Sequence, residues 1–315
     1  MDKQPASHGS KTVIYAALTG NALIALTKFI AAFLTGSAAM LAEGIHSVVD
    51  TGNQILLLVG LRRAARPPDE EHPFGYGKEI YFWSFVVAIL LFSLGAGISI
   101  YEGVYHLLHP KPISHVYANY VVLVLAMIFE GGAWLLGFRE FNRRRGGYGI
   151  LEAVRRGKDP NLFVVLFEDS AAILGLLSAG IGLLLWQLTG NPLFDGAASI
   201  VIGIILGLTA IWLAAETKGL LIGEPAHPNV VQGIRSIVTA SPIARQINEV
   251  ATLHMGPEFI LVTISVRFDP DATAERVQNE VASLNRRIKG QFPEIKRVFI
   301  EGETADIARR EREVY

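Results

Sequence analysis

One apolar stretch of the chain carries polar side chains at helical spacing. His46 and Asp50 are four residues apart in AEGIHSVVDTGNQ, and Glu43 and Asn53 extend the pattern on either side. Residues three or four positions apart share one face of a helix. An imidazole and a carboxylate one turn apart suit a divalent cation such as Zn²⁺, which accepts nitrogen and oxygen ligands. The spacing predicts metal ligands at His46 and Asp50, with Asn53 as a further ligand. Glu43 is either a neighbour of that site or a carboxylate at the water interface.

Two other apolar stretches also contain carboxyl groups. Glu168 and Asp169 lie in LFEDSAAILG, and Glu130 lies in MIFEGGAW. An ionisable side chain at the centre of a bilayer costs roughly 2.5–3.5 kcal/mol on insertion scales, so such residues indicate a functional site. Neighbouring residues point about 100° apart on a helix, so only one of Glu168 and Asp169 can face a given site. Glu130 either belongs to the cation site or joins helices by hydrogen bonds.

We expect no lysine or arginine partner for these carboxyl groups at membrane depth, so that cations or protons must neutralise them. Histidine titrates at about pH 6.5 in isolation, and it must be neutral to bind a metal ion. The same side chains can therefore hold either a metal ion or protons. This alternation is the chemical basis of a proton-coupled antiporter.

The composition is that of an integral membrane protein. The chain has 315 residues, a mean hydropathy of +0.37 and 18% charged residues, against about 25% in soluble proteins. A net charge of −1 gives no indication of nucleic-acid binding, and the absence of cysteine excludes disulfides and thiolate ligands. Six apolar segments are long enough to cross a bilayer. They cover about 12–35, 38–61, 80–107, 116–138, 161–188 and 193–220.

Charge in the connections predicts the orientation. The connections at 62–78 and 139–158 are rich in arginine, whereas the others carry a single lysine. The positive-inside rule then places both arginine-rich connections and both termini in the cytoplasm. The polar N-terminus is predicted to be a cytosolic tail, and the membrane a bacterial-type inner or plasma membrane. The second connection is predicted to contact anionic lipid.

The membrane domain, residues 1–221, is followed by a sequence of soluble character. Apolar residues occupy every second position of EFILVTISVRF, as in a half-buried strand. The segment TAERVQNEVASLNRRIKG has apolar residues at helical spacing and ends at Gly290. The order α-β-β-α-β predicts a small, ferredoxin-like α+β domain at 222–304, with helices on one face of an antiparallel sheet. A domain of about 80 residues gains stability by pairing, so a homodimer is expected. Residues 305–315 form a charged tail.

Four parts of the sequence, LAEGIHSVVDTGNQ, RPPDEEHPFGYGKEIYFWS, PLFDGAAS and the α+β region, resemble the cation diffusion facilitator family of metal/proton antiporters. LFEDSAAILG is similar to its mitochondrial zinc-transporter-like branch. The resemblance implies a homodimeric exporter, not an enzyme, with six spans and paired cytosolic domains. Its transport site would lie between spans 2 and 5, with His46 and Asp50 as ligands. Zn²⁺ would be the substrate, and no prosthetic group is implied.

The fifth span departs from the family pattern, in which histidine and aspartate are one turn apart. With Asp169 at the aspartate position, Val165 stands where the histidine would be. A shift of three residues would instead place Leu162 and Leu166 at the two positions. Glu168, Asn53 or water could supply the fourth ligand. An oxygen-rich site also admits Mn²⁺, Fe²⁺ or Co²⁺.

Two further segments contain residues that could bind a metal ion or cap a helix. Asp69 and His72 match two ligands of an accessory loop site in some family members, but Tyr76 occupies the third position, which argues against a robust metal site there. Asp195 begins the sixth span, where helix N-capping is the expected role.

Three functions are compatible with these features. The leading hypothesis is a secondary transporter that exports divalent cations, most of all Zn²⁺, in exchange for protons by alternating access. The missing histidine of span 5 instead favours a membrane scaffold or metal sensor that does not transport. The third hypothesis is an antiporter for Mn²⁺, Fe²⁺ or Co²⁺.

Overall fold

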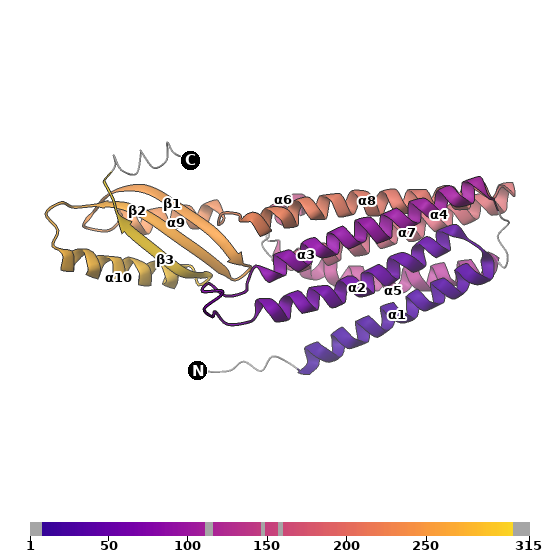
Figure 1. Ribbon diagram of the computed structural model, residues 1–315, viewed down its shortest axis with the longest axis horizontal. Coiled ribbons are helices and arrows are strands. Elements are labelled where there is room, and N and C mark those ends of the chain that lie inside the picture. Colours follow the sequence, from indigo (N-terminus) through magenta and orange to yellow (C-terminus); the bar gives the residue numbers. More distant parts are fainter. Residues whose placement is uncertain (1–7, 111–115, 146–148, 157–159, 305–315) are drawn as a thin grey trace. The chain divides into compact units, whose positions relative to one another are not determined.

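The computed structural model describes residues 8–110, 116–145, 149–156 and 160–304. The chain divides into two compact units. The first contains most of the long helices, and the second contains Arg63–Tyr81 together with the chain from Lys218 onward. Both units can be followed in Figure 1 by their helices and strands.

Long helices make up the first unit. The uninterrupted ones are α1 (His8–Thr35), α2 (Ala38–Ala64), α5 (Val116–Arg144), α7 (Pro160–Thr189) and α8 (Leu193–Ile222). A further continuous run joins α3 (Glu79–Leu90), the π-helix η1 (Leu91–Ala96) and α4 (Gly97–Leu108), and a short α6 spans Ile150–Arg156. Neither η1 nor α6 was expected from the sequence.

Four helical runs of the described chain are long and apolar enough to cross a membrane. They are Glu79–Leu108, Val116–Arg143, Phe163–Thr189 and Leu193–Ile222. Helix α2 has a similar length, but its polar stripe lowers its mean hydropathy. Among the residues whose side chains the structure describes, α1 contributes the shorter apolar segment Ala22–Thr35. The chain is therefore a membrane protein with several apolar helices, and the full set of six spans stays a prediction.

The first turn of α8 caps a different helix. Asp195 accepts hydrogen bonds from Ser37 Oγ and from the Ala38 backbone N–H, both at 2.5 Å, at the start of α2. The expectation that Asp195 caps its own helix is wrong, because α8 begins two residues earlier and Asn191 Oδ1 accepts from its Leu193 N–H at 3.0 Å. The first N–H groups of α2 lack partners within the helix, and Asp195 satisfies one of them.

Replacing Asp195 with alanine should therefore destabilise the start of α2. Loss of a capping side chain costs about 0.5–2 kcal/mol, so we expect a lower midpoint of thermal unfolding in detergent. Asp195→Asn retains one acceptor oxygen, which can accept from Ser37 or from Ala38, and its midpoint should fall less. Equal midpoints for wild type and Asp195→Ala would contradict the capping role.

The second unit contains a small sheet covered by two helices. Its elements are α9 (Pro228–Thr239), β1 (Ala244–Gly256), β2 (Phe259–Phe268), α10 (Ala274–Gln291) and β3 (Ile295–Gly302). This order confirms the predicted α-β-β-α-β sequence of elements. The core contains alternate residues of β2 and one face of each helix, including Val262, Ile264, Ile234 and Leu284.

The strand directions differ from the prediction. In the sheet order β1-β2-β3, β1 is antiparallel to β2, but β2 is parallel to β3. The predicted antiparallel sheet is therefore wrong for β3. Helix α10 carries the chain back across the sheet between β2 and β3, and such a crossover connects parallel strands.

The connection between α2 and α3 packs against this sheet within the second unit. A Cβ at Gly77 would collide with the backbone carbonyl of Met255 in β1. The rings of Phe74 and Phe299 meet edge to face, with centroids 6.5 Å apart. The HPFGYG segment is thus part of the α+β unit as well as a link between helices.

Candidate metal site

The polar residues of α2 face two different surroundings. Glu43, His46 and Asn53 are buried among the helices. Ser47, Asp50 and Gln54 line a cavity. The polar face of α2 expected from the sequence is therefore wide enough to contribute residues both to a buried cluster and to a cavity wall. Asp50 belongs to both.

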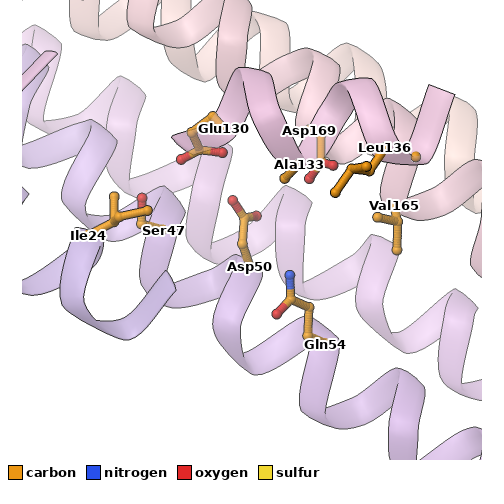
Figure 2. A pocket seen from close by; sticks show the side chains of 10 residues that line it. Ile24, Ser47, Asp50, Gln54, Glu130, Ala133, Leu136, Val165 and Asp169 are labelled. Atoms are coloured by element: carbon orange, nitrogen blue, oxygen red, sulfur yellow. The ribbon is translucent and has the colours of Figure 1, made fainter. Parts of the chain in front are cut away.

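The cavity has a volume of about 280 Å³ and lies between α1, α2, α5 and α7. Three carboxyl-bearing residues from three helices line it: Asp50, Glu130 and Asp169. Figure 2 shows their side chains directed at the same space. The remaining wall is formed by Ile24, Ser47, Gln54, Ala133, Leu136, Gly137 and Val165. An apolar bundle with convergent carboxyl groups is suited to a cation.

His46 lies behind Asp50 and does not line the cavity. Its Nδ1 is 3.3 Å from Asp50 Oδ1, and its side chain is fully buried. Among the described residues, neither ring nitrogen has a hydrogen bond of good geometry. A cation in the cavity would therefore meet the Asp50 carboxylate before it met His46.

The two acidic residues of α7 point in different directions. Asp169 lines the cavity, whereas Glu168 is buried and accepts a hydrogen bond from Asn53 Nδ2. Glu168 is also a hydrogen-bond partner of Asp50. This division follows from the roughly 100° step between neighbouring helical residues. Asp50 thus connects the buried cluster of His46, Asn53 and Glu168 with the cavity.

A buried ion pair contradicts the expectation that these carboxyl groups have no basic partner. Lys28 Nζ in α1 is 3.1 Å from Glu43 Oε2 and 3.2 Å from Glu130 Oε1. Glu43 is fully buried, so it is not a carboxylate at the water interface. Lys28 was not predicted to belong to this cluster, although a lysine in the middle of an apolar run itself indicates a functional site.

The donors are not gathered around one point in this conformation. Within the described ranges, no three histidine, aspartate or glutamate side chains are close enough together to hold one metal ion. Asp50 and Asp169 line the cavity from two different helices, and Val165 lies in its wall with Asp169. A cation bound there would be held mainly by oxygen atoms.

The loop residues Asp69 and His72 belong to the second unit. Asp69 accepts hydrogen bonds from the Tyr76 hydroxyl at 2.6 Å and from the His72 backbone N–H at 2.7 Å. These bonds, the Tyr76 bond foremost, lower the pKa of the Asp69 carboxyl. The Asp69 side chain orders the loop, and Tyr76 occupies an oxygen that a metal ion would need.

Comparison with known proteins identifies the family to which the helical part of the chain belongs. Residues 14–222 match the model of the cation efflux transmembrane domain. The chain belongs to this family. Members of the family are transporters, so the protein is not an enzyme.

Several curated proteins are similar to this cation efflux protein. The mitochondrial proton-coupled zinc antiporter SLC30A9 of Homo sapiens is 35% identical over 263 residues, which is 83% of this chain and 46% of the relative. Metal tolerance protein C4 of Arabidopsis thaliana is 36% identical over 68% of this chain and 48% of its own length. The manganese efflux system protein MneP of Bacillus subtilis is 22% identical over 92% of this chain and 95% of its own length. The chain spans about half the length of the first two relatives.

Proposed function

We propose that this protein exports a divalent metal cation, Zn²⁺ foremost, from the cytoplasm in exchange for protons. The observation that carries the proposal is the convergence of Asp50, Glu130 and Asp169 on one cavity inside an apolar helix bundle. Asp50 and Asp169 are the proposed direct ligands. His46, Asn53 and Glu168 are proposed to orient Asp50 and to join the coordination when α2 and α7 move.

The same groups supply the proton side of the exchange. Asp50 and Glu168 are hydrogen-bond partners, and two carboxyl groups in such contact share a proton unless a bound cation allows both to be ionised. A metal ion that reaches Asp50 therefore replaces a proton. When the metal is released on the other side of the membrane, a proton from that side binds in its place, which couples the two flows.

The resemblance to a zinc antiporter supports Zn²⁺, but the cavity itself supports a second substrate class. Val165 replaces an imidazole in its wall, and carboxylate oxygens suit Mn²⁺ better than they suit soft metals. The relative from Bacillus subtilis is named for manganese efflux. An antiporter for Mn²⁺, Fe²⁺ or Co²⁺ is therefore the second candidate.

The proposed setting has six spans, with both termini in the cytoplasm of a bacterial-type inner or plasma membrane. Arginine-rich segments at 62–78 and 139–158 support this orientation, and the second of them is proposed to meet anionic lipid. The α+β domain at 222–304 is proposed to pair in a homodimer. Alternating access would expose the cavity first to one side of the membrane and then to the other.

Purified protein in liposomes with an internal metal-sensitive dye tests this function. An outwardly directed proton gradient should drive Zn²⁺ inward, and Mn²⁺ measured in parallel decides between the two substrate classes. Collapse of the proton gradient should slow the uptake. Binding of metal without any flux in oriented, intact liposomes would instead favour the scaffold or sensor hypothesis.

A further inference from the structure

Lys28 is a fully buried lysine in the helical unit, and each of its ammonium donors has a partner. Nζ donates to Ser47 Oγ at 2.8 Å, to Glu43 Oε2 at 3.1 Å and to Glu130 Oε1 at 3.2 Å. An ammonium group has three N–H donors, so this geometry uses all of them. The acceptors come from α2 and α5, and Lys28 thereby connects α1 to both helices.

The two carboxylates bound to Lys28 have different surroundings. Glu43 is fully buried, and a Cβ at Gly175 of α7 would collide with its Oε1. Glu130 is 14% exposed and lines the cavity with Asp50 and Asp169. Glu130 is therefore the carboxylate that can interact both with Lys28 and with a cation in the cavity.

Acidic side chains around the cavity outnumber basic ones. Five carboxyl groups lie in this cluster: Glu43, Asp50, Glu130, Glu168 and Asp169. Among the described residues that contact them at hydrogen-bond or ion-pair distance, Lys28 supplies the permanent positive charge. A divalent cation in the cavity would be attracted by the same carboxylates and repelled by the ammonium group.

We propose that Lys28 is the resident counter-cation of the transport cavity, and that it competes with the transported metal ion for Glu130. The proposal rests on the proposed function, because it takes a divalent cation as the ligand of the cavity. When the metal approaches Asp50 and Asp169, Glu130 turns from Lys28 towards it. When the metal leaves, Glu130 returns to Lys28, so that Glu130 is not left without a counter-charge.

This competition limits how tightly the metal is held. A cavity with several ionised carboxylates and no fixed cation would bind a divalent ion strongly and release it slowly. Lys28 lowers the affinity and thereby permits release, as a transporter requires. Lys28 is thus a positioning and affinity-setting residue, and it need not touch the metal.

The first test measures Zn²⁺ affinity of the purified full chain in detergent, by calorimetry, separately from its transport. Lys28→Met should lower the Kd for Zn²⁺ by about tenfold or more, since one nearby positive charge is removed. Its transport rate at saturating Zn²⁺ should fall, because release becomes slower. Thr27→Met introduces the same side chain at the exposed neighbouring position and should leave both quantities unchanged.

The second test is a double-mutant cycle between Lys28 and Glu130. Glu130→Gln should raise the Kd for Zn²⁺ severalfold, and in that background Lys28→Met should have a much smaller effect. If Lys28→Met does not fold because Glu43 is left unpaired, Lys28→Met with Glu43→Gln removes both charges of the deeper pair and should still bind Zn²⁺ more tightly.

The outcomes separate this inference from the proposed function. The competition is overturned if the Zn²⁺ affinity of a folded Lys28→Met protein is unchanged or weaker, or if that of Glu130→Gln is unchanged. Transport by the wild-type protein would still support the proposed function. A wild-type protein that neither binds nor moves a divalent cation overturns both.

Discussion

Asp50→Ala is expected to abolish metal transport. Asp50 is the residue at which the cavity meets the buried cluster, through His46 Nδ1 at 3.3 Å and through Glu168. Its removal takes away a proposed metal ligand and the carboxyl group that exchanges a proton for the metal. We expect the rate of Zn²⁺ uptake into proteoliposomes to fall at least about a hundredfold, which corresponds to a rise of about 2.7 kcal/mol in the barrier to uptake.

The matched control for this variant is Asp195→Asn. Asp195 is also a buried carboxyl group of the helical unit, but it lies at the start of α2 and contacts Ser37 and Ala38. It should retain most of the wild-type uptake. Uptake that survives Asp50→Ala at the level of Asp195→Asn would show that the cavity is not the path of the metal.

Val165→His is expected to shift the preference of the site towards Zn²⁺. Val165 lines the cavity one turn before Asp169, and an imidazole there would add a nitrogen ligand beside two carboxylates. Imidazole favours Zn²⁺ over Mn²⁺, and one added ligand should raise the ratio of Zn²⁺ to Mn²⁺ affinity about tenfold, or 1.4 kcal/mol. Equilibrium binding of both metals to the purified protein measures this ratio.

Val165→Phe provides the control, because it adds volume to the same wall without a ligand atom. It should weaken the binding of Zn²⁺ and Mn²⁺ equally and leave the ratio of their affinities unchanged. If Val165→His changed the ratio no more than Val165→Phe does, then position 165 would not lie beside the bound cation.

The polar positions of α2 could be found from the sequence because helical spacing is a local property. The i, i+4 relation of His46 and Asp50 predicts a shared face, and the structure brings the two side chains to 3.3 Å. Spacing alone did not show that Asp50 lines a cavity while His46 lies behind it. That difference depends on where α5 and α7 pack against α2.

Contacts between distant segments account for what the sequence did not predict. Lys28 pairs with Glu130, which is 102 residues further along the chain, and Asp195 caps a helix that begins 157 residues before it. The direction of β3 likewise depends on how α10 crosses the sheet. Periodicity identifies the face of an element, but the partner of that face is fixed only by packing of the whole unit.

The central claim is that one cavity exchanges a divalent cation for protons, and proton movement driven by metal tests it most directly. Wild-type protein is reconstituted into liposomes that contain a pH-sensitive dye, with equal pH on both sides, and Zn²⁺ is added outside. We expect the internal pH to rise as Zn²⁺ enters, and Asp50→Ala to abolish both changes. Entry of Zn²⁺ with no change of internal pH would contradict it.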